Sequence, residues 1–121
     1  MGQNRRKLGS AYEQLAGELL EKEGYEILEY NVHSRAGEID IVARDEEYLV
    51  FIEVKYRKDD SWGNPFEAVS VGKQRTISKC ALSYLKKHGM FDVPVRFDVV
   101  GILGKEIQII KNAFEFCGNQ Y

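Results

Sequence analysis

Hydrophobic residues recur along this chain with two different spacings, and the spacing separates expected helices from expected strands. Helical spacing, with apolar residues three and four positions apart, covers residues 10–23 and 70–88. The buried stripes would consist of Tyr12, Leu15, Ala16, Leu19 and Leu20 in the first helix and Ile77, Cys80, Ala81, Tyr84 and Leu85 in the second. Ser10 and Glu13 have the spacing of a capping box at the start of the first helix, and Gly89 closes the second.

Five further segments have the shorter apolar pattern that is typical of strands. They are residues 25–31, 37–44, 48–57, 93–103 and 105–114, with tight turns expected at residues 45–47 and at Gly104. A helix that connects two strands usually returns the chain parallel to the first strand. The order helix, three strands, helix, two strands therefore predicts an α/β fold, with a mixed five-stranded sheet flanked by helices.

Length and composition place this pattern in one domain. The chain has 121 residues, of which 44% are hydrophobic, so we expect a single domain over residues 1–121 with residues 1–8 flexible. The longest apolar runs have five residues, far fewer than the roughly 18 that a membrane helix needs. Cys80 and Cys117 lack a metal-binding spacing, which predicts reduced thiols and, with no secretory signal pattern, a cytoplasmic protein.

The distribution of charged residues along the chain says more about possible binding partners than the net charge does. The net charge of −2 weighs against indiscriminate binding of nucleic acid. Basic residues nevertheless gather within residues 56–58 and 73–87, and acidic residues within 13–29 and 38–47. A protein with one basic side is compatible with this pattern.

Three charged residues interrupt the apolar strands at residues 37–57. Strand side chains alternate faces, so Glu53 and Lys55 point the same way. On the preceding strand, Asp40 shares its face with Glu38 and Val42, opposite Ile39. A hairpin turn centred between residues 46 and 47 pairs Asp40 with Glu53 across the two strands, with their Cβ atoms roughly 4.5–5.5 Å apart.

Two carboxylates held opposite each other are destabilising unless a positive charge lies between them. Mg²⁺ or Mn²⁺ would remove the conflict, because hard cations of this kind bind carboxylate oxygens and keep other positions for water and phosphate. Asp40 and Glu53 would bind the metal, and Lys55 would hold the attacking water or neutralise a phosphate. The alternative is a ladder of surface salt bridges, each contributing roughly 0–1 kcal/mol.

This arrangement resembles the PD-(D/E)XK nuclease superfamily, whose hairpin carries an acid followed by (D/E)-x-K. Asp40 matches the first acid and Glu53-Val54-Lys55 matches the second part, whereas Ile39 replaces the proline. More closely, the chain resembles the uncharacterised bacterial YraN-like family, related to Holliday-junction resolvases. The matching stretches cover nearly the whole chain: YEQLAGELLEKEGY, GEIDIVARD, VFIEVKYRK, VGKQRTISKCALSYL and VRFDVV.

The resemblance implies a restriction-endonuclease-like core and a nuclease acting on DNA, plausibly branched or damaged. In the resolvase relatives an acid on the first helix completes the metal site, and Glu13 matches it here. The alternative role of Glu13 is only that of capping partner to Ser10. Relatives that cut symmetric junctions act as dimers, so the resemblance also implies a homodimer.

Two basic residues are candidates for contacts with nucleic acid. Lys73 begins the second helix, where a phosphate would meet the helix N-terminus, and Arg57 continues the face of Lys55. A solvated lysine and an ordinary edge charge are the respective alternatives. Arg96 and Asp98, which alternate on one strand face, are expected to pair with each other or with a neighbouring strand.

The leading hypothesis is therefore a metal-dependent nuclease, with Asp40, Glu53 and Lys55 as catalytic residues. The second is a non-catalytic module that keeps the fold and binds nucleic acid or protein. The third is a structural role in which the acidic residues only face solvent.

Overall fold

The computed structural model describes residues 11–67 and 69–117, and it confirms the expected order of elements. Along the chain they are α2 (Ala11–Lys22), β1 (Glu26–His33), β2 (Glu38–Asp45), β3 (Tyr48–Arg57), the short 3₁₀ helix η1 (Asp60–Trp62), α3 (Val71–His88), β4 (Val95–Leu103) and β5 (Glu106–Phe114). The predictions for residues 1–8 and for Ser10 as an N-cap lie outside the described residues.

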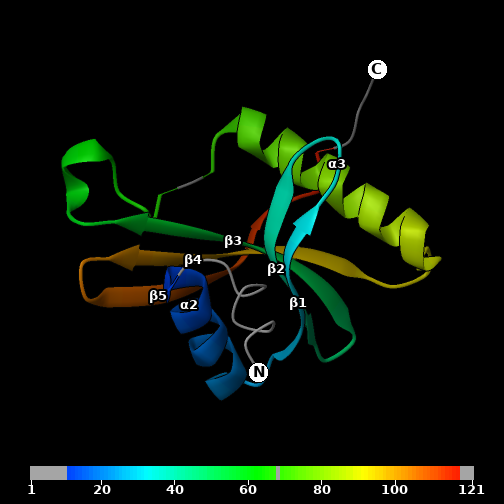
Figure 1. The fold of residues 1–121 in the computed structure, drawn as a ribbon, viewed down its shortest axis with the longest axis horizontal. Helices are drawn as coiled ribbons and strands as arrows, with labels where there is room; N and C mark the ends of the chain where they lie inside the picture. Colours follow the sequence, from blue (N-terminus) through cyan, green and yellow to red (C-terminus); the bar gives the residue numbers. More distant parts are fainter. Residues whose placement is uncertain (1–10, 68, 118–121) are drawn as a thin grey trace.

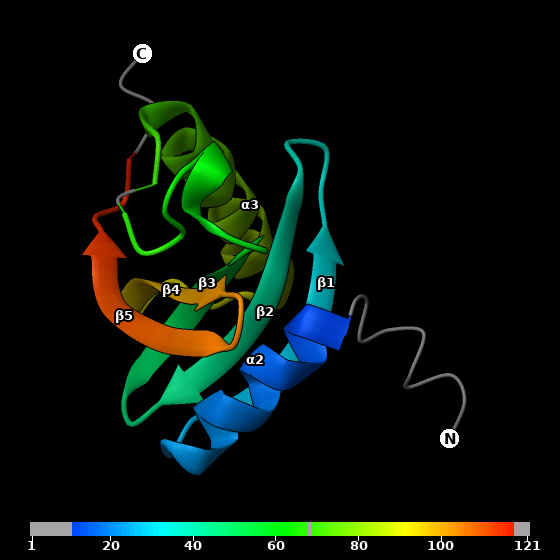
Figure 2. The ribbon, with the colours of Figure 1, turned by 90° about the vertical axis from the view of Figure 1, so that its left-hand side faces the viewer.

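The five strands form one mixed sheet in the order β1-β2-β3-β4-β5. β3 and β4 are parallel and the other neighbours antiparallel, because α3 carries the chain back across the sheet between β3 and β4. Figure 1 and Figure 2 show α2 and α3 on opposite sides of this sheet. Within the part of the chain that is described, no helix is both long and apolar enough to cross a membrane.

Each face of the sheet has its own hydrophobic core. On β3, Leu49 and Phe51 pack into the cluster beneath α3, whereas Val50 and Ile52 pack into the cluster beneath α2. All four side chains are fully buried. Burial on both faces explains why β3 reads as an almost continuous apolar run up to Glu53.

The sequence located α3 closely. The Ser70 hydroxyl accepts a hydrogen bond from the Lys73 N–H at 3.2 Å and caps the first turn. Gly89 ends the helix in the left-handed conformation, with φ 64°. Ile77, Cys80, Ala81 and Tyr84 of the predicted stripe are buried, and Leu85 packs against the same cluster.

The stripe predicted for α2 is rotated in the structure. Its buried residues are Ala16, Gly17 and Leu20, whereas Tyr12 and Leu15 are 39% and 45% exposed. The helix lies close against β1 at Gly17, where a Cβ atom would lie 2.0 Å from the hydroxyl oxygen of Tyr30. Because of this rotation Glu13, four positions before Gly17, lies on the sheet side of the helix.

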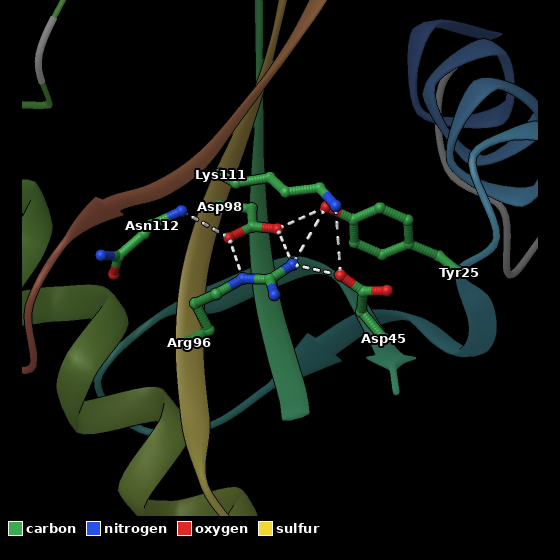
Figure 3. A network of polar contacts seen from close by, with 6 residues as sticks. All are labelled: Tyr25, Asp45, Arg96, Asp98, Lys111 and Asn112. Carbon is green, nitrogen blue, oxygen red and sulfur yellow. Dashed lines mark hydrogen bonds and ion pairs between the residues drawn. The ribbon is translucent and has the colours of Figure 1, made fainter. Parts of the chain in front are cut away.

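A buried polar network joins β2, β4 and β5 to Tyr25, the residue just before β1 (Figure 3). Its centre is the carboxylate of Asp98, which is 0% exposed. Asp98 accepts hydrogen bonds from the Tyr25 hydroxyl at 2.6 Å, from Arg96 Nε and Nη2 at 2.9 and 2.7 Å, and from the Asn112 N–H at 2.9 Å. Arg96 Nη2 also pairs with Asp45 at 2.8 Å, so the expected Arg96–Asp98 pair is confirmed and extended. Such complete pairing is what makes a buried charge tolerable.

Replacing Asp98 with Asn tests how much this network stabilises the fold. The amide has one acceptor oxygen for four donors, and its NH₂ group would face an N–H or O–H that also donates. We expect Asp98→Asn to lower the free energy of unfolding by about 3 kcal/mol, measured by urea denaturation. The exposed Asp92→Asn control should change it by less than about 0.5 kcal/mol, and an equally small change for Asp98→Asn would contradict the prediction.

Candidate functional site

The β2–β3 hairpin has the register that the sequence predicted. Its backbone pairs run from Asp45 with Tyr48 at the turn to Ile41 with Ile52. One step further along the same register, Asp40 comes beside Glu53. The two acids are therefore neighbours at the place where the backbone pairing of the two strands ends.

The Asp40 side chain takes over the pairing at this point. Its Oδ2 accepts a hydrogen bond from the backbone N–H of Val54 at 2.8 Å. Strand N–H groups point within the plane of the sheet, so the carboxylate lies between β2 and β3 rather than above one face. The fold thus fixes one carboxylate between the two strands.

Alternation of faces fails on β2 next to Asp40, and the predicted position of Ile39 is wrong. Ile39 packs with Val42 in the cluster beneath α3, although Ile41 packs in the cluster beneath α2. On β1 the residue between their partners is Asn31, which has a φ of 52°. This local change of both strands explains why Asp40 points between the strands.

Asp40 and Glu53 form a half-buried pair of like charges. Burial and the negative charge of Glu53 raise the pKa of Asp40 to about 7. Burial also raises the pKa of Glu53, against the opposing effects of Lys73 and Lys55. With its pKa raised to about 7, the Asp40 carboxyl holds a proton over much of the acidic range in which an ordinary aspartate is already ionised. A cation could replace that proton.

Two more carboxylates reach Asp40 from the α2 side of the sheet. Oxygen atoms of Glu13, Glu38 and Asp40 all lie within 4.8 Å of one another. Asn31 Nδ2 donates to Glu13 Oε1 and to Glu38 Oε2, both at 2.8 Å. Asn31 Oδ1 is buried and has no hydrogen-bond partner among the described residues. The amide therefore joins α2 to β2 through β1.

This donor set fits a hard divalent cation. Carboxylate and amide oxygens are the ligands that Mg²⁺ and Mn²⁺ prefer, and neither nitrogen nor sulfur ligands are needed. Glu13, Glu38 and Asp40 are close enough to share one ion, and Glu53 adjoins the group through Asp40. Asn31 holds Glu13 and Glu38 together through its Nδ2, and its buried Oδ1 lacks a donor among the described residues.

The predicted basic residues gather on the other side of Glu53. Lys55, Arg57 and Lys73 line a surface cavity of about 450 Å³ together with Glu53. Lys73 Nζ lies 3.7 Å from Glu53 Oε2, whereas Lys55 Nζ donates to the backbone oxygen of Glu67 at 3.0 Å. Burial lowers the pKa of Lys55. A phosphate in this cavity would meet two lysines and an arginine.

The structure thus brings the predicted residues together in two adjoining groups. Glu13 meets Asp40 on the α2 side, and the basic residues meet Glu53 at the cavity. Sequence reasoning did not select Glu38 or Asn31. The position of Glu38 two residues before Asp40 was a usable signal. Asn31 gave none, because the pairing of β1 with β2 could not be derived from a turn.

Comparison with known proteins finds one family along most of this chain. The model of the "Uncharacterised protein family UPF0102" matches residues 12–102. A UPF0102 protein of Lachnoclostridium phytofermentans is 46% identical over 117 residues, covering 96% of this chain and 99% of the relative. A UPF0102 protein of Geobacter metallireducens is 47% identical over 121 residues, covering 97% of this chain and 99% of the relative. A UPF0102 protein of Marinobacter nauticus is 44% identical over 115 residues, covering 91% of this chain and 94% of the relative.

The raised pKa of Asp40 predicts a dependence of stability on pH. Its ordinary value is 3.8 and its value in the fold about 7, so the folded protein binds a proton more tightly than the unfolded chain. The stability that this proton contributes is complete below about pH 4 and is lost as the pH rises through 7. Asp40→Asn keeps an uncharged acceptor for Val54 and should therefore gain stability relative to wild type between pH 4 and pH 8.

We expect this gain to reach about 1–3 kcal/mol at pH 8, measured as the difference in the free energy of unfolding in metal-free buffer. Asp92→Asn, at an exposed position, is the matched control and should show no such trend. A difference between Asp40→Asn and wild type that is constant over this pH range would contradict the prediction.

Proposed function

Because the chain belongs to the uncharacterised protein family UPF0102, we propose its function from the geometry of the site: metal-dependent hydrolysis of phosphodiester bonds in DNA. The observation that carries the proposal is the group of carboxylates around Asp40, next to a cavity lined by basic residues. Anionic oxygens for a cation and ammonium groups for a phosphate are the two requirements of this chemistry.

In this proposal Asp40, Glu53 and Glu13 hold Mg²⁺ or Mn²⁺, and Glu38 joins them as a fourth carboxylate. The cation, when bound, supplies a lowered water pKa and stabilises the charge that develops on the phosphate. Asp40 is the fixed member, because its hydrogen bond to the Val54 N–H holds it in place. A metal binds the ionised form of Asp40, whose pKa is raised to about 7, so metal binding should strengthen as the pH rises.

Lys55 is the proposed partner of the reacting groups. Its ammonium is held by the Glu67 backbone oxygen at 3.0 Å beside Glu53, which leaves two of its three N–H groups for a water or a phosphate oxygen. Burial lowers the pKa of Lys55, so proton exchange with a bound water is easier than for an exposed lysine. Positioning of the water and neutralisation of phosphate charge are both consistent with this placement.

Arg57 and Lys73 are the proposed contacts to the DNA backbone, since both line the cavity beside Glu53. Phosphate contacts position a nucleic acid but do not read its sequence. We therefore propose recognition of DNA structure, with branched or damaged DNA favoured by the resemblance to Holliday-junction resolvases. The same resemblance favours a homodimer, because a two-fold symmetric junction presents two equivalent strands.

The central test is cleavage of linear, flap and four-way-junction DNA by the purified protein in Mn²⁺, beside the Asp40→Ala plus Glu53→Ala double variant. We expect the wild type to cleave and to bind Mn²⁺, and the double variant to do neither. Because Asp40→Ala also removes the acceptor of the Val54 N–H, Asp40→Asn plus Glu53→Gln is tested beside it. This second double variant keeps an acceptor, and its melting temperature in metal-free buffer should be unchanged or higher, because a like-charge pair has been removed. Loss of activity in the double variant would then reflect the site and not the fold.

Two other results would favour the other hypotheses. DNA binding that survives in the double variant, without cleavage in any metal, indicates a binding module that keeps the fold. Neither binding nor cleavage indicates a structural role. Equal cleavage by both proteins would end the nuclease proposal.

Replacing Lys55 separates chemistry from metal binding. Lys55→Met keeps the length of the aliphatic chain and removes the ammonium, so Mn²⁺ affinity should be retained or rise. The rate of cleavage should fall by about 10²-fold or more, the range expected for loss of a proton-transferring or charge-stabilising group. Lys22→Met, on an exposed residue at the end of α2 that does not line the cavity, is the control and should cleave within about threefold of wild type.

A further inference from the structure

We propose that Lys73 is the built-in countercharge of the metal-free site, and that a divalent cation displaces its ammonium from Glu53. The inference rests on the proposed metal site and adds a regulatory step to it. Lys73 would then hold two positions in turn, one at Glu53 and one at a phosphate in the cavity.

The position of Lys73 allows such a movement. Its backbone is fixed in the first turn of α3 by the Ser70 cap, whereas its side chain is 49% exposed. The ammonium lies 3.7 Å from Glu53 Oε2, and the Glu53 side chain is only 13% exposed. The mobile partner of this ion pair is thus the lysine, because it can leave Glu53 without disturbing the core.

Lys55 is less suited to this role, although it is closer in sequence to Glu53. Its ammonium is tied to the Glu67 backbone oxygen at 3.0 Å, which holds it against the segment before α3. The structure therefore gives the two lysines different tasks. Lys55 connects β3 to this segment, and Lys73 neutralises Glu53.

A cation and the Lys73 ammonium compete for the same carboxylate. Glu53 already adjoins Asp40, so a metal that uses both acids places positive charge beside Lys73. Like charges repel at this range, and the ion pair that Lys73 loses was partly exposed and weak. Metal binding should therefore release Lys73 into the cavity, which Arg57 and Ser70 also line.

The released ammonium would face any phosphate in the cavity. The cation would then have two effects on phosphate binding. It would add its own positive charge, and it would free the Lys73 ammonium to contact the phosphate. Because such coupling is reciprocal, a phosphate that holds Lys73 away from Glu53 would also favour metal binding.

The test is the dissociation constant of Mn²⁺ measured by isothermal titration calorimetry, at pH 8 and 0.15 M salt without nucleic acid. Lys73→Met removes the competitor and should bind Mn²⁺ roughly 3- to 10-fold more tightly than wild type. Lys73→Arg keeps the charge and should stay close to wild type. Lys79→Met removes an exposed lysine elsewhere on α3, and its long-range effect is largely screened at this salt concentration.

Unchanged Mn²⁺ affinity in Lys73→Met, or an equal gain in Lys79→Met, would overturn the inference, as would absence of Mn²⁺ binding in all four proteins. Lys73→Gln repeats the measurement if the methionine variant has a lower melting temperature. The proposed function fails separately. If the wild type cleaves DNA but Lys73→Met binds Mn²⁺ with unchanged affinity, the nuclease proposal stands and the countercharge role of Lys73 fails. If Lys73→Met binds Mn²⁺ more tightly but the wild type does not cleave DNA, the countercharge role stands and the nuclease proposal fails.

Discussion

The candidate site depends on one hydrogen bond, from the backbone N–H of Val54 to the carboxylate of Asp40. Two strands that separate leave unpaired backbone groups, and such groups are costly to bury. Here a side chain satisfies one of them, so the same contact that completes the sheet also fixes a carboxylate between β2 and β3. The acids on either side are arranged around this fixed group, which gives the site a rigid reference on secondary structure.

Gathering carboxylates in this way opposes folding, and the structure offsets the cost locally. The raised pKa of Asp40 favours a proton on its carboxyl, the amide of Asn31 donates to both Glu13 and Glu38, and the ammonium of Lys73 approaches Glu53. Each compensation is of a kind that a cation or a substrate can replace. Local destabilisation of this sort is common where binding requires it, and the two hydrophobic cores carry the stability of the rest of the molecule.

Much of this was predictable, and the differences have physical causes. The hairpin register followed from a short turn between two apolar strands, and α3 followed from its spacing, its Ser70 cap and Gly89. The buried side of α2 could not be derived from the apolar spacing. The rotation of this helix depends on how closely Gly17 approaches Tyr30, a residue of β1. Asn31 was missed for a similar reason: its positive φ and its place opposite Asp40 depend on strand pairing that hydrophobic pattern alone does not determine.

The two-layered arrangement of helices has a consequence for how such a protein can diverge. Glu13 lies on the helix on one side of the sheet and approaches Asp40, whereas Lys73 lies on the helix on the other side and approaches Glu53. Repacking of one layer during evolution would therefore shift the half that we propose to hold a cation, while leaving in place the half that we propose to meet a phosphate. Ion preference and substrate preference could in this way drift apart in different lineages, each along its own core.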